Sequence, residues 1–379
     1  MNKSFAYKDL LNVLRKSQGK EPQTLVSECW SCSIPLDLKE GICEAVQGDN
    51  RLLNKWLFSK ENDYETSLAW IAPVKSRGHS YAWMVGKVNK SACEVHEWFQ
   101  DALTGIKQDP LLNQDHFPAQ LLFVDTEEVS SVSTGEFGYE DEFAIFQVGY
   151  RDVPVEVSDF DQRMVINTSH ALSKRQEAFR RLIKLSDLDS EGGLATCLQQ
   201  NLELFSIIHN EGHNMGHYVG AWPYEEEVKR QSVMYEVVEE FKACLASIAL
   251  CNHLPLSELE KDAFAVSVFM SRFLGYGYDA FKLESQKRET AREITVGLMF
   301  FEWLLREEVI EIPESGKIKL TANKVRSSLM QAYIEIFEFE KSVAKTSIDK
   351  LGPYGRSWYS LAFPDGNYSQ YSLNVYNRI

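Results

Sequence analysis

The chain has 379 residues, of which 44% are hydrophobic and 12% aromatic, so it is long enough to bury one large core or two moderate ones. Its formal net charge of −15 disfavours nucleic acid and anionic membranes as partners, because phosphate groups are bound by clustered Lys and Arg. It has no run of about 18 apolar residues and no signal peptide-like start, so we expect a cytoplasmic protein without a membrane span.

The first part of the chain, residues 1–165, is predicted to be a mixed α+β lobe. Several of its segments alternate apolar and polar residues, as half-buried strands do, and one amphipathic segment between them predicts a helix. The predicted strands lie within 67–88, 120–125 and 143–157, and the predicted helix spans 92–106.

The cysteines indicate a reducing compartment. Seven of them, an odd number, are scattered through a long chain without secretory features, which is typical of reduced thiols. Cys29 and Cys32 form a CxxC pair, but no second pair follows it and no thioredoxin-like pattern surrounds it. A redox or metal role for this pair is therefore the less favoured interpretation.

The second part, residues 166–350, is predicted to be a mainly helical lobe. Helical periodicity dominates it, and a hairpin is expected at 310–320, with its turn at 314–316. Gly275 and Gly277 lack the preceding strand of a dinucleotide-binding loop, and they predict a turn between two helices. We expect the two lobes to share an interface, with a substrate cleft between them.

Three of the eight histidines, His209, His213 and His217, recur at intervals of four. This spacing returns side chains to nearly the same face of a helix, as in the HExxH helix whose two histidines bind zinc. The outer two lie about 12 Å apart along a helix and about 80° apart around it, so one ion cannot bind all three. His213 belongs to both possible pairs. The pair of His213 and His217 is favoured, because residues 218–223 end the helix there and open it to a ligand. The alternative is a set of hydrogen-bonded core histidines.

A third ligand is expected from the next helix, residues 233–250, which carries Glu236, Glu239 and Glu240 among apolar residues. Glu236 and Glu240 lie four apart on one face, beside a strip that contains Cys244. We expect one of the glutamates to point inward and to contribute a carboxylate to the metal. The alternative is a solvated acidic edge.

These residues resemble the motifs of the zinc-dependent dipeptidyl peptidase III family and related zinc hydrolases. That family carries an HExxGH-type helix, followed by a helix with EExxA whose second Glu completes the zinc site. Gly216 and His217 match the end of the first motif, and residues 239–243 match the second. The resemblance extends over about 194–355. It implies a zincin-like metal helix, Zn²⁺ as the cofactor and Glu240 as a ligand.

The sequence departs from that family at the general base. In the HExxH frame the position of the catalytic Glu holds Asn214, and an amide cannot take a proton from metal-bound water. Glu211 and Glu239 are candidate replacements, although Glu211 lies about 160° around the helix from His213 and needs a distorted helix to reach the metal. Tyr218 is a candidate hydrogen-bond donor to a developing oxyanion, with a buried core tyrosine as the alternative.

Residues 351–379 form an aromatic-rich C-terminal segment. Such aromatic density rarely stays in solvent, so we expect the segment to pack on the rest of the protein or on a partner subunit of a homodimer. Its aromatic residues are Tyr354, Trp358, Tyr359, Phe363, Tyr368, Tyr371 and Tyr376.

Three classes of function are consistent with these patterns. In the first, Zn²⁺ held by His213, His217 and Glu240, with His209 as the alternative histidine, hydrolyses a peptide, an amide or a small amino-acid-derived substrate. In the second, two histidines and one carboxylate hold Fe²⁺ in a non-haem oxygenase or oxidase. In the third, the protein is a non-catalytic scaffold that binds peptides. Asn214 favours the second and third classes, whereas the family resemblance favours the first.

Overall fold

The structure, a computed structural model, describes residues 9, 12–13, 16–17, 22–47, 72–75, 81–112, 122–131, 143–147, 162–188, 193–216, 233–283, 288–312, 317–342, 348–364 and 366–379. The chain forms two compact units, Met1–Cys93 with Ala119–Ala171, and Glu94–Pro118 with Leu172–Ile379. The segment Glu94–Pro118 thus belongs to the second unit, although it lies upstream of residue 165. Most of the described residues are helical, as predicted for the second part of the chain.

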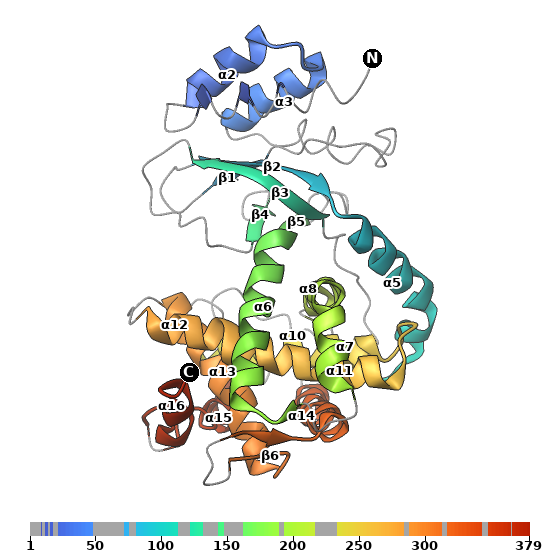
Figure 1. Cartoon of the computed structure of the whole chain (residues 1–379), viewed down its shortest axis with the longest axis vertical. Coiled ribbons are helices and arrows are strands. Elements are labelled where there is room, and N and C mark those ends of the chain that lie inside the picture. Colours follow the sequence, from blue (N-terminus) through green and yellow to red (C-terminus); the bar gives the residue numbers. More distant parts are fainter. Residues whose placement is uncertain are drawn as a thin grey trace. The chain divides into compact units, whose positions relative to one another are not determined.

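The first unit contains a mixed sheet with the strand order β1-β2-β3-β5-β4 (Figure 1). Strands β3 and β5 are parallel, and the other neighbours are antiparallel. The strands are β1 Ala72–Lys75, β2 Tyr81–Val88, β3 Leu122–Ser131, β4 Phe143–Gln147 and β5 Gln162–Asn167. Strand β5 was not predicted, because QRMVIN is a run of three apolar residues between polar ones rather than an alternation.

The α+β lobe expected at 1–165 stays a prediction as a whole, because 48–71, 113–121 and 148–161 lie outside the described residues. The same holds for the part of the predicted strand 143–157 that follows residue 147.

Two helices of the first unit, α2 (Pro22–Ser31) and α3 (Leu36–Val46), pack against each other. Each buries residues four apart, which are Leu25 and Cys29 on α2 and Leu38 and Ile42 on α3. Burial raises the pKa of the Cys29 thiol to about 12, and the neighbouring thiols contribute in the same direction. This cysteine is therefore a protonated core thiol at neutral pH rather than an activated thiolate.

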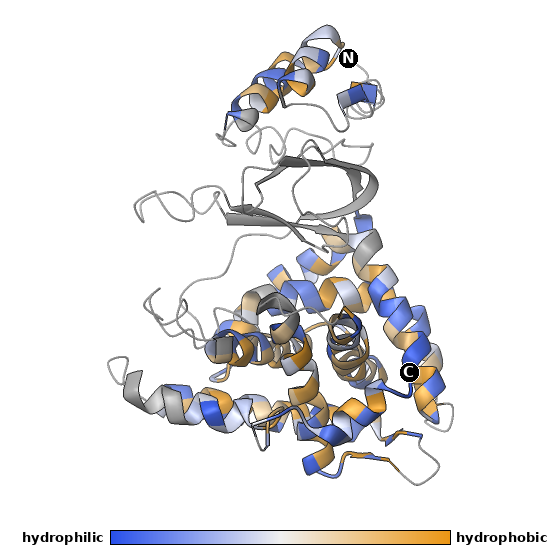
Figure 2. Cartoon of the chain, turned by 90° about the vertical axis from the view of Figure 1, so that its left-hand side faces the viewer, coloured by the Kyte–Doolittle hydropathy of each residue, from blue (hydrophilic) through white to orange (hydrophobic). Residues whose placement is uncertain are grey.

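The second unit is a bundle of helices around α10, Val233–Cys251 (Figure 1). Every residue from 241 to 250 is buried, as expected for a helix with neighbours on all sides. The surrounding helices carry hydrophilic and hydrophobic residues together, as amphipathic helices at the surface of a core do (Figure 2). The other helices that lie wholly or mainly in this unit are α5 Lys90–Gln108, α6 Thr168–Leu185, α7 Leu194–Gln200, α8 Leu202–Gly216, α11 Glu258–Met270, α12 Tyr278–Lys282, α13 Arg288–Arg306, α14 Ala322–Ser342, α15 Ile348–Tyr359 and α16 Gln370–Tyr376.

The predicted hairpin is confirmed. Strand β6, Ile310–Glu311, pairs antiparallel with β7, Lys319–Leu320. Residues 313–316, which include the predicted turn, lie outside the described residues.

The turn predicted at Gly275 and Gly277 is wrong, because the chain stays helical there. A π-helix, η2 (Ser271–Gly277), joins α11 directly to α12. A Cβ on Gly297 of α13 would lie 2.7 Å from the carbonyl oxygen of Arg272, so this glycine lets α13 touch the π-helix. The two glycines of the motif therefore belong to a tightly packed bulge, in which a wider helical turn replaces a loop.

The C-terminal helix α16 completes this bulge. The Tyr376 hydroxyl donates a hydrogen bond of 3.0 Å to the carbonyl oxygen of Phe273 in η2. The two rings stack with their centroids 4.8 Å apart, and Tyr376 is fully buried. This end of the aromatic segment therefore packs within the second unit.

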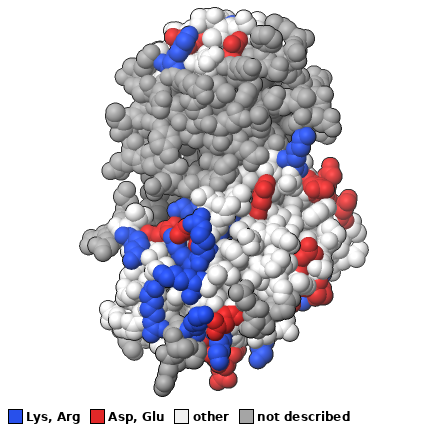
Figure 3. Space-filling view, in the orientation of Figure 1, with Lys and Arg blue, Asp and Glu red and all other residues white. Residues whose placement is uncertain are grey.

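Basic residues gather on one part of the surface of the second unit (Figure 3). Helix α6 contributes Lys174, Arg180, Arg181 and Lys184 to the surface. Asp279 of α12 approaches both Lys174 and Arg181, at 2.7 and 2.8 Å, so part of this charge is neutralised. Among the described residues, no helix is both long and apolar enough to cross a membrane.

Candidate metal centre

Helices α8 and α10 lie unusually close together because α8 has two glycines where they meet. A Cβ on Gly212 would lie 2.9 Å from the Cβ of Ser247, and a Cβ on Gly216 would lie 2.6 Å from the carbonyl oxygen of Ala243. Real side chains do not approach so closely, so both positions require glycine for this packing. The glycines thus bring the ligand-bearing faces of the two helices together.

The close packing places His213 of α8 opposite Glu240 of α10. Their Nε2 and Oε1 atoms are 3.1 Å apart. Cys244 lies one turn after Glu240, and the ligand atoms of His213, Glu240 and Cys244 all lie within 4.8 Å of one another. His213 and Glu240 are half-buried, and Cys244 is buried. We call these three residues the His213 group.

The pKa values of the His213–Glu240 pair are shifted in opposite directions. Burial alone would lower the pKa of His213, but the Glu240 carboxylate outweighs it and raises this pKa to about 9. Burial would raise the pKa of Glu240, but His213 and Arg272 outweigh it and hold this pKa well below its ordinary range. Without a metal the pair is therefore an imidazolium and a carboxylate at neutral pH, and a metal must displace the proton on His213.

Arg272, in the π-helix η2, is a member of the site that the sequence did not identify. Its Nη2 lies 2.9 Å from Oε1 of Glu240, and its Nη1 lies 3.3 Å from Oε2 of Glu293 on α13. Arg292 also contacts Glu293, at 2.7 Å. In the sequence, Arg272 is the lone Arg of the apolar run 263–274. An Arg in such a run is buried only with a partner, so this pattern could have identified Arg272 as a candidate for an ion pair.

His209 lies one turn before His213 and has a different partner. The guanidinium of Arg175 on α6 lies 2.6 Å from Nδ1 of His209, and it also donates to the hydroxyl of Ser267 at 2.7 Å. A guanidinium only donates hydrogen bonds, so Nδ1 accepts and the proton of the neutral ring is on Nε2. Burial, followed by the charge of Arg175, holds the pKa of His209 well below its ordinary range.

In this arrangement neither nitrogen of the His209 ring offers a lone pair to a metal. Its Nε2 is buried and has no hydrogen-bond partner among the residues that the structure describes. The rings of His209 and His213 meet edge to face with their centroids 5.4 Å apart. The geometry therefore favours His213 over His209 as a ligand.

The two candidate bases lie against other partners. Glu211 is buried and its Oε1 lies 3.5 Å from Nδ1 of His96 on α5; burial raises the pKa of Glu211. Glu239 lies 3.1 Å from the fully buried Nζ of Lys242. The same Nζ lies 3.0 Å from Glu340 of α14. Neither candidate base is part of the His213 group.

His217 and Tyr218 lie outside the described residues, as does the side chain of Asn214, although its backbone continues α8. Their proposed roles stay predictions. Cys244 was seen in the sequence only as part of a strip beside the glutamates. Its spacing of four from Glu240 was the signal that it shares the ligand face.

The His213 group fits a divalent metal ion. Neutral imidazole, carboxylate and thiolate are all ligands that zinc uses, and three protein ligands leave a position for water or substrate. The thiolate favours zinc over magnesium or calcium, which prefer oxygen ligands.

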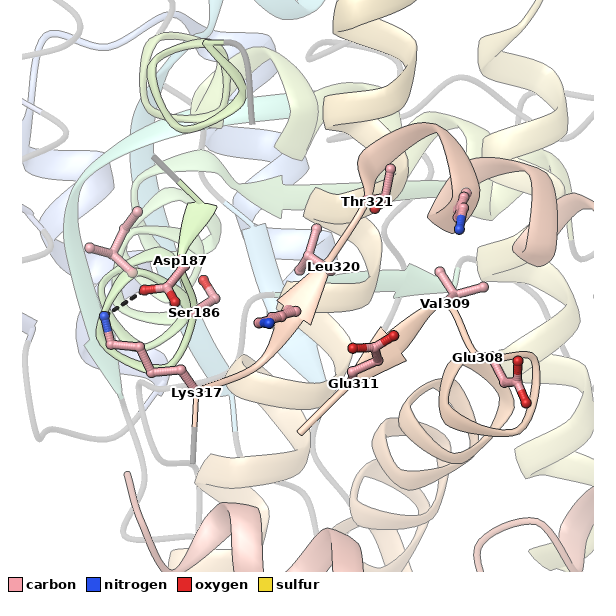
Figure 4. Close-up of a pocket in the computed structure, with 11 residues that line it drawn as sticks. Ser186, Asp187, Glu308, Val309, Glu311, Lys317, Leu320 and Thr321 are labelled. Carbon is pink, nitrogen blue, oxygen red and sulfur yellow. Dashed lines mark hydrogen bonds and ion pairs between the residues drawn. The ribbon is translucent and has the colours of Figure 1, made fainter. Parts of the chain in front are cut away.

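A surface pocket of about 640 Å³ lies elsewhere in the second unit, between the end of α6, the β6–β7 pair and the start of α14 (Figure 4). Lys317 and Asp187 meet at one end of it, with Nζ and Oδ1 2.6 Å apart. None of the described residues that line this pocket belongs to the His213 group. The charged side chains that line this pocket are exposed and of both signs, so they do not form a buried binding site for a ligand of one charge.

No family model and no curated protein matches this sequence. Solved structures do match its fold, and two dipeptidyl peptidases III are among them. A dipeptidyl peptidase III from Caldithrix abyssi has a TM-score of 0.64 at 11% identity, over 100% of this chain and 70% of that chain. A dipeptidyl peptidase III from Corallococcus sp. strain EGB has a TM-score of 0.55 at 10% identity, over 99% of this chain and 67% of that chain. The chain therefore has the fold of dipeptidyl peptidase III, although its sequence is only 11% and 10% identical to these two structures.

Proposed function

We propose that the protein is a zinc-dependent hydrolase of a peptide, an amide or a small amino-acid-derived substrate. The observation that supports this most strongly is the His213 group, whose three ligand atoms lie within 4.8 Å of one another on two closely packed helices. The likeness of the fold to dipeptidyl peptidase III supports the same class of function. His217, predicted from its spacing, is proposed as the alternative to Cys244 for the third ligand position, so that one position stays open for water or substrate.

The bound ion would polarise a carbonyl oxygen and lower the pKa of a bound water. The residues of the chain supply the positioning. In the metal-free site the 3.1 Å contact with Glu240 orients the His213 ring, and Arg175 fixes the tautomer of His209. The Nε2–H of His209 is then a buried donor one turn from the ligand His213.

The general base is where the chain departs most from an ordinary zinc hydrolase. Asn214 replaces the glutamate of the zinc motif, and both Glu211 and Glu239 lie against other partners. We therefore expect no appreciable hydrolysis of simple dipeptidyl substrates by the wild type. The same observation favours a second candidate function, a scaffold that binds peptides without cleaving them. An iron oxygenase is less favoured, because a facial triad uses two histidines and one carboxylate, whereas the described group contains a thiol.

Elemental analysis of protein purified without added metal tests the proposal. We expect about one zinc per chain, loss of that zinc in His213→Ala, and its retention in His253→Ala. His253 is a matched control, because it is also paired with a carboxylate, Asp109, at 3.0 Å, outside the His213 group. Zinc-loaded protein should then release product from a peptide library. Equal zinc in wild type and His213→Ala would rule out this site, whereas zinc and peptide binding without product would favour the scaffold.

A further inference from the structure

Arg272 connects two carboxylates that belong to different helices. Its side chain is 7% exposed, and it reaches Glu240 of α10 and Glu293 of α13 from the π-helix η2. π-helices are rare and are concentrated at functional sites. The bulge is fixed by Gly297 and by the hydroxyl of Tyr376, so the position of Arg272 depends on several elements of the unit.

The contact of Arg272 with Glu240 involves the oxygen atom that a metal would need. Oε1 of Glu240 lies 3.1 Å from Nε2 of His213 and 2.9 Å from Nη2 of Arg272. Both nitrogen atoms donate to this oxygen when the site holds no ion. A cation between His213 and Glu240 takes the same lone pair, and its charge also repels the guanidinium.

Glu293 offers Arg272 an alternative partner. Its Oε2 already lies 3.3 Å from Nη1 of Arg272, so a small movement brings the guanidinium fully onto Glu293. Glu293 also contacts Arg292 at 2.7 Å, and this second charge-assisted contact holds the carboxylate in place. The guanidinium can therefore leave Glu240 without being left unpaired in a buried site.

We propose that Arg272 is an internal competitor for the metal, which holds Glu240 when the ion is absent and moves onto Glu293 when the ion binds. The Arg272–Glu293 pair then sets the metal affinity of the site. This inference rests on the proposed zinc site, and it adds a positioning residue that no zinc motif contains.

Zinc affinity, measured by competition with a coloured chelator, tests the exchange. Arg272→Gln removes the competing cation and should tighten zinc binding by about 10-fold or more, the order expected for a lost charge-assisted hydrogen bond. Glu293→Gln removes the alternative partner and should weaken binding by a similar factor. Arg326→Gln is the matched control, because Arg326 pairs with Glu258 and Asp262 away from η2.

A second measurement reports which carboxylate Arg272 contacts, without using zinc affinity. In the presence of a chelator, a double-mutant cycle of Arg272→Gln with Glu240→Gln should show coupling between the two side chains in thermal unfolding. A cycle of Arg272→Gln with Glu293→Gln should show coupling that increases when zinc is added. If Arg272→Gln fails to fold, Glu293→Gln and Arg272→Lys still report on the exchange.

The outcomes separate this inference from the proposed function. Wild type that binds zinc, with Arg272→Gln equal or weaker, overturns the competition but leaves the zinc site intact. Zinc binding by Arg272→Gln alone supports the competition and contradicts zinc as the resident metal of the wild type. Binding by neither protein overturns both.

Discussion

Helix α8 carries an imidazole–carboxylate pair on each of two faces, and the two pairs behave in opposite ways. On one face His213 meets Glu240 of α10 at 3.1 Å, and on the other Glu211 meets His96 of α5 at 3.5 Å. The pKa of Glu240 is held well below its ordinary range, whereas burial raises the pKa of Glu211. His213 lowers the pKa of Glu240 most, and Arg272 adds a second positive charge there. Among the described residues, Glu211 has only His96 to oppose its burial.

The comparison shows that a buried His–Glu pair does not by itself make a metal site. The His213 face also has a thiol, a closely packed partner helix and a guanidinium, whereas the Glu211 carboxylate has only His96 as an ionisable partner among the described residues. Ligand affinity for a cation requires a carboxylate that stays ionised when buried. The four predictions below test this difference between the two faces.

The largest effect is expected from giving α8 the carboxylate that the zinc motif has at residue 214. In the proposed hydrolase, Asn214→Glu should raise peptide hydrolysis by about 10²–10⁴-fold, the usual contribution of a positioned base. The measurement is kcat/KM of zinc-loaded protein on a dipeptidyl substrate, with Asn214→Gln as the control, because it lengthens the side chain but keeps a neutral amide. An unchanged rate with normal zinc content would indicate a peptide-binding scaffold instead.

The next effect is on metal retention. Glu240→Gln should weaken zinc binding by about 10-fold or more, because a neutral amide replaces an ionised ligand. Glu211→Gln should leave zinc affinity nearly unchanged, since Glu211 lies against His96. Chelator competition measures both. If Glu236→Gln proves to be the damaging change, the ligand lies one turn earlier on α10.

The glycine contact can be tested through stability. Gly216→Ala should lower the free energy of unfolding by about 1–3 kcal/mol, because its Cβ would press on the backbone of Ala243. The matched control is Gly105→Ala on α5, where a Cβ would meet only the His253 ring at an ordinary 3.5 Å. That control should be neutral or stabilising by up to about 1 kcal/mol. Similar losses in denaturant titrations of both variants would mean that the close approach of α8 and α10 is not needed.

The smallest effect is a difference in pH dependence, measured in metal-free protein. Glu240 has a lowered pKa, so its contribution to stability is present above the ordinary Glu value of 4.5 and is lost as the pH falls. Glu211 has a raised pKa, so its contribution is present below 4.5 and is lost as the pH rises. The difference in unfolding free energy between wild type and Glu240→Gln should therefore increase from acid to neutral pH, below the pH near 9 at which His213 loses its proton, and that for Glu211→Gln should decrease over the same range. Parallel profiles would contradict the opposite ionisation of the two faces.

The sequence predicted the features that depend on local spacing. Periodicity identified the helical character of the second part and the β6–β7 hairpin, and the EExxA pattern pointed to Glu240. It did not identify Arg175 or Arg272, because each reaches the site from a distant segment and its partner is fixed only by tertiary packing. The π-helix was missed for a related reason. Two glycines suit a turn locally, and only the close contacts of Gly277 with Tyr376 and with Glu293 of α13 make a bulge favourable.

The glycine contact between α8 and α10 also determines when the site is assembled. At Gly212 and Gly216 the backbone of α8 lies directly against Ser247 and Ala243 of α10, with no flexible side chain between the helices. The separation of the two helices is therefore set by hard contact within the apolar core. The helix faces that carry His213, Glu240 and Cys244 are therefore held together without a metal, unlike those of zinc fingers, whose folding is driven by the metal. In the proposed zinc site, binding energy that is not needed for folding would remain available for selecting among metals, and the metal-free protein would bind an ion again after the first one is removed.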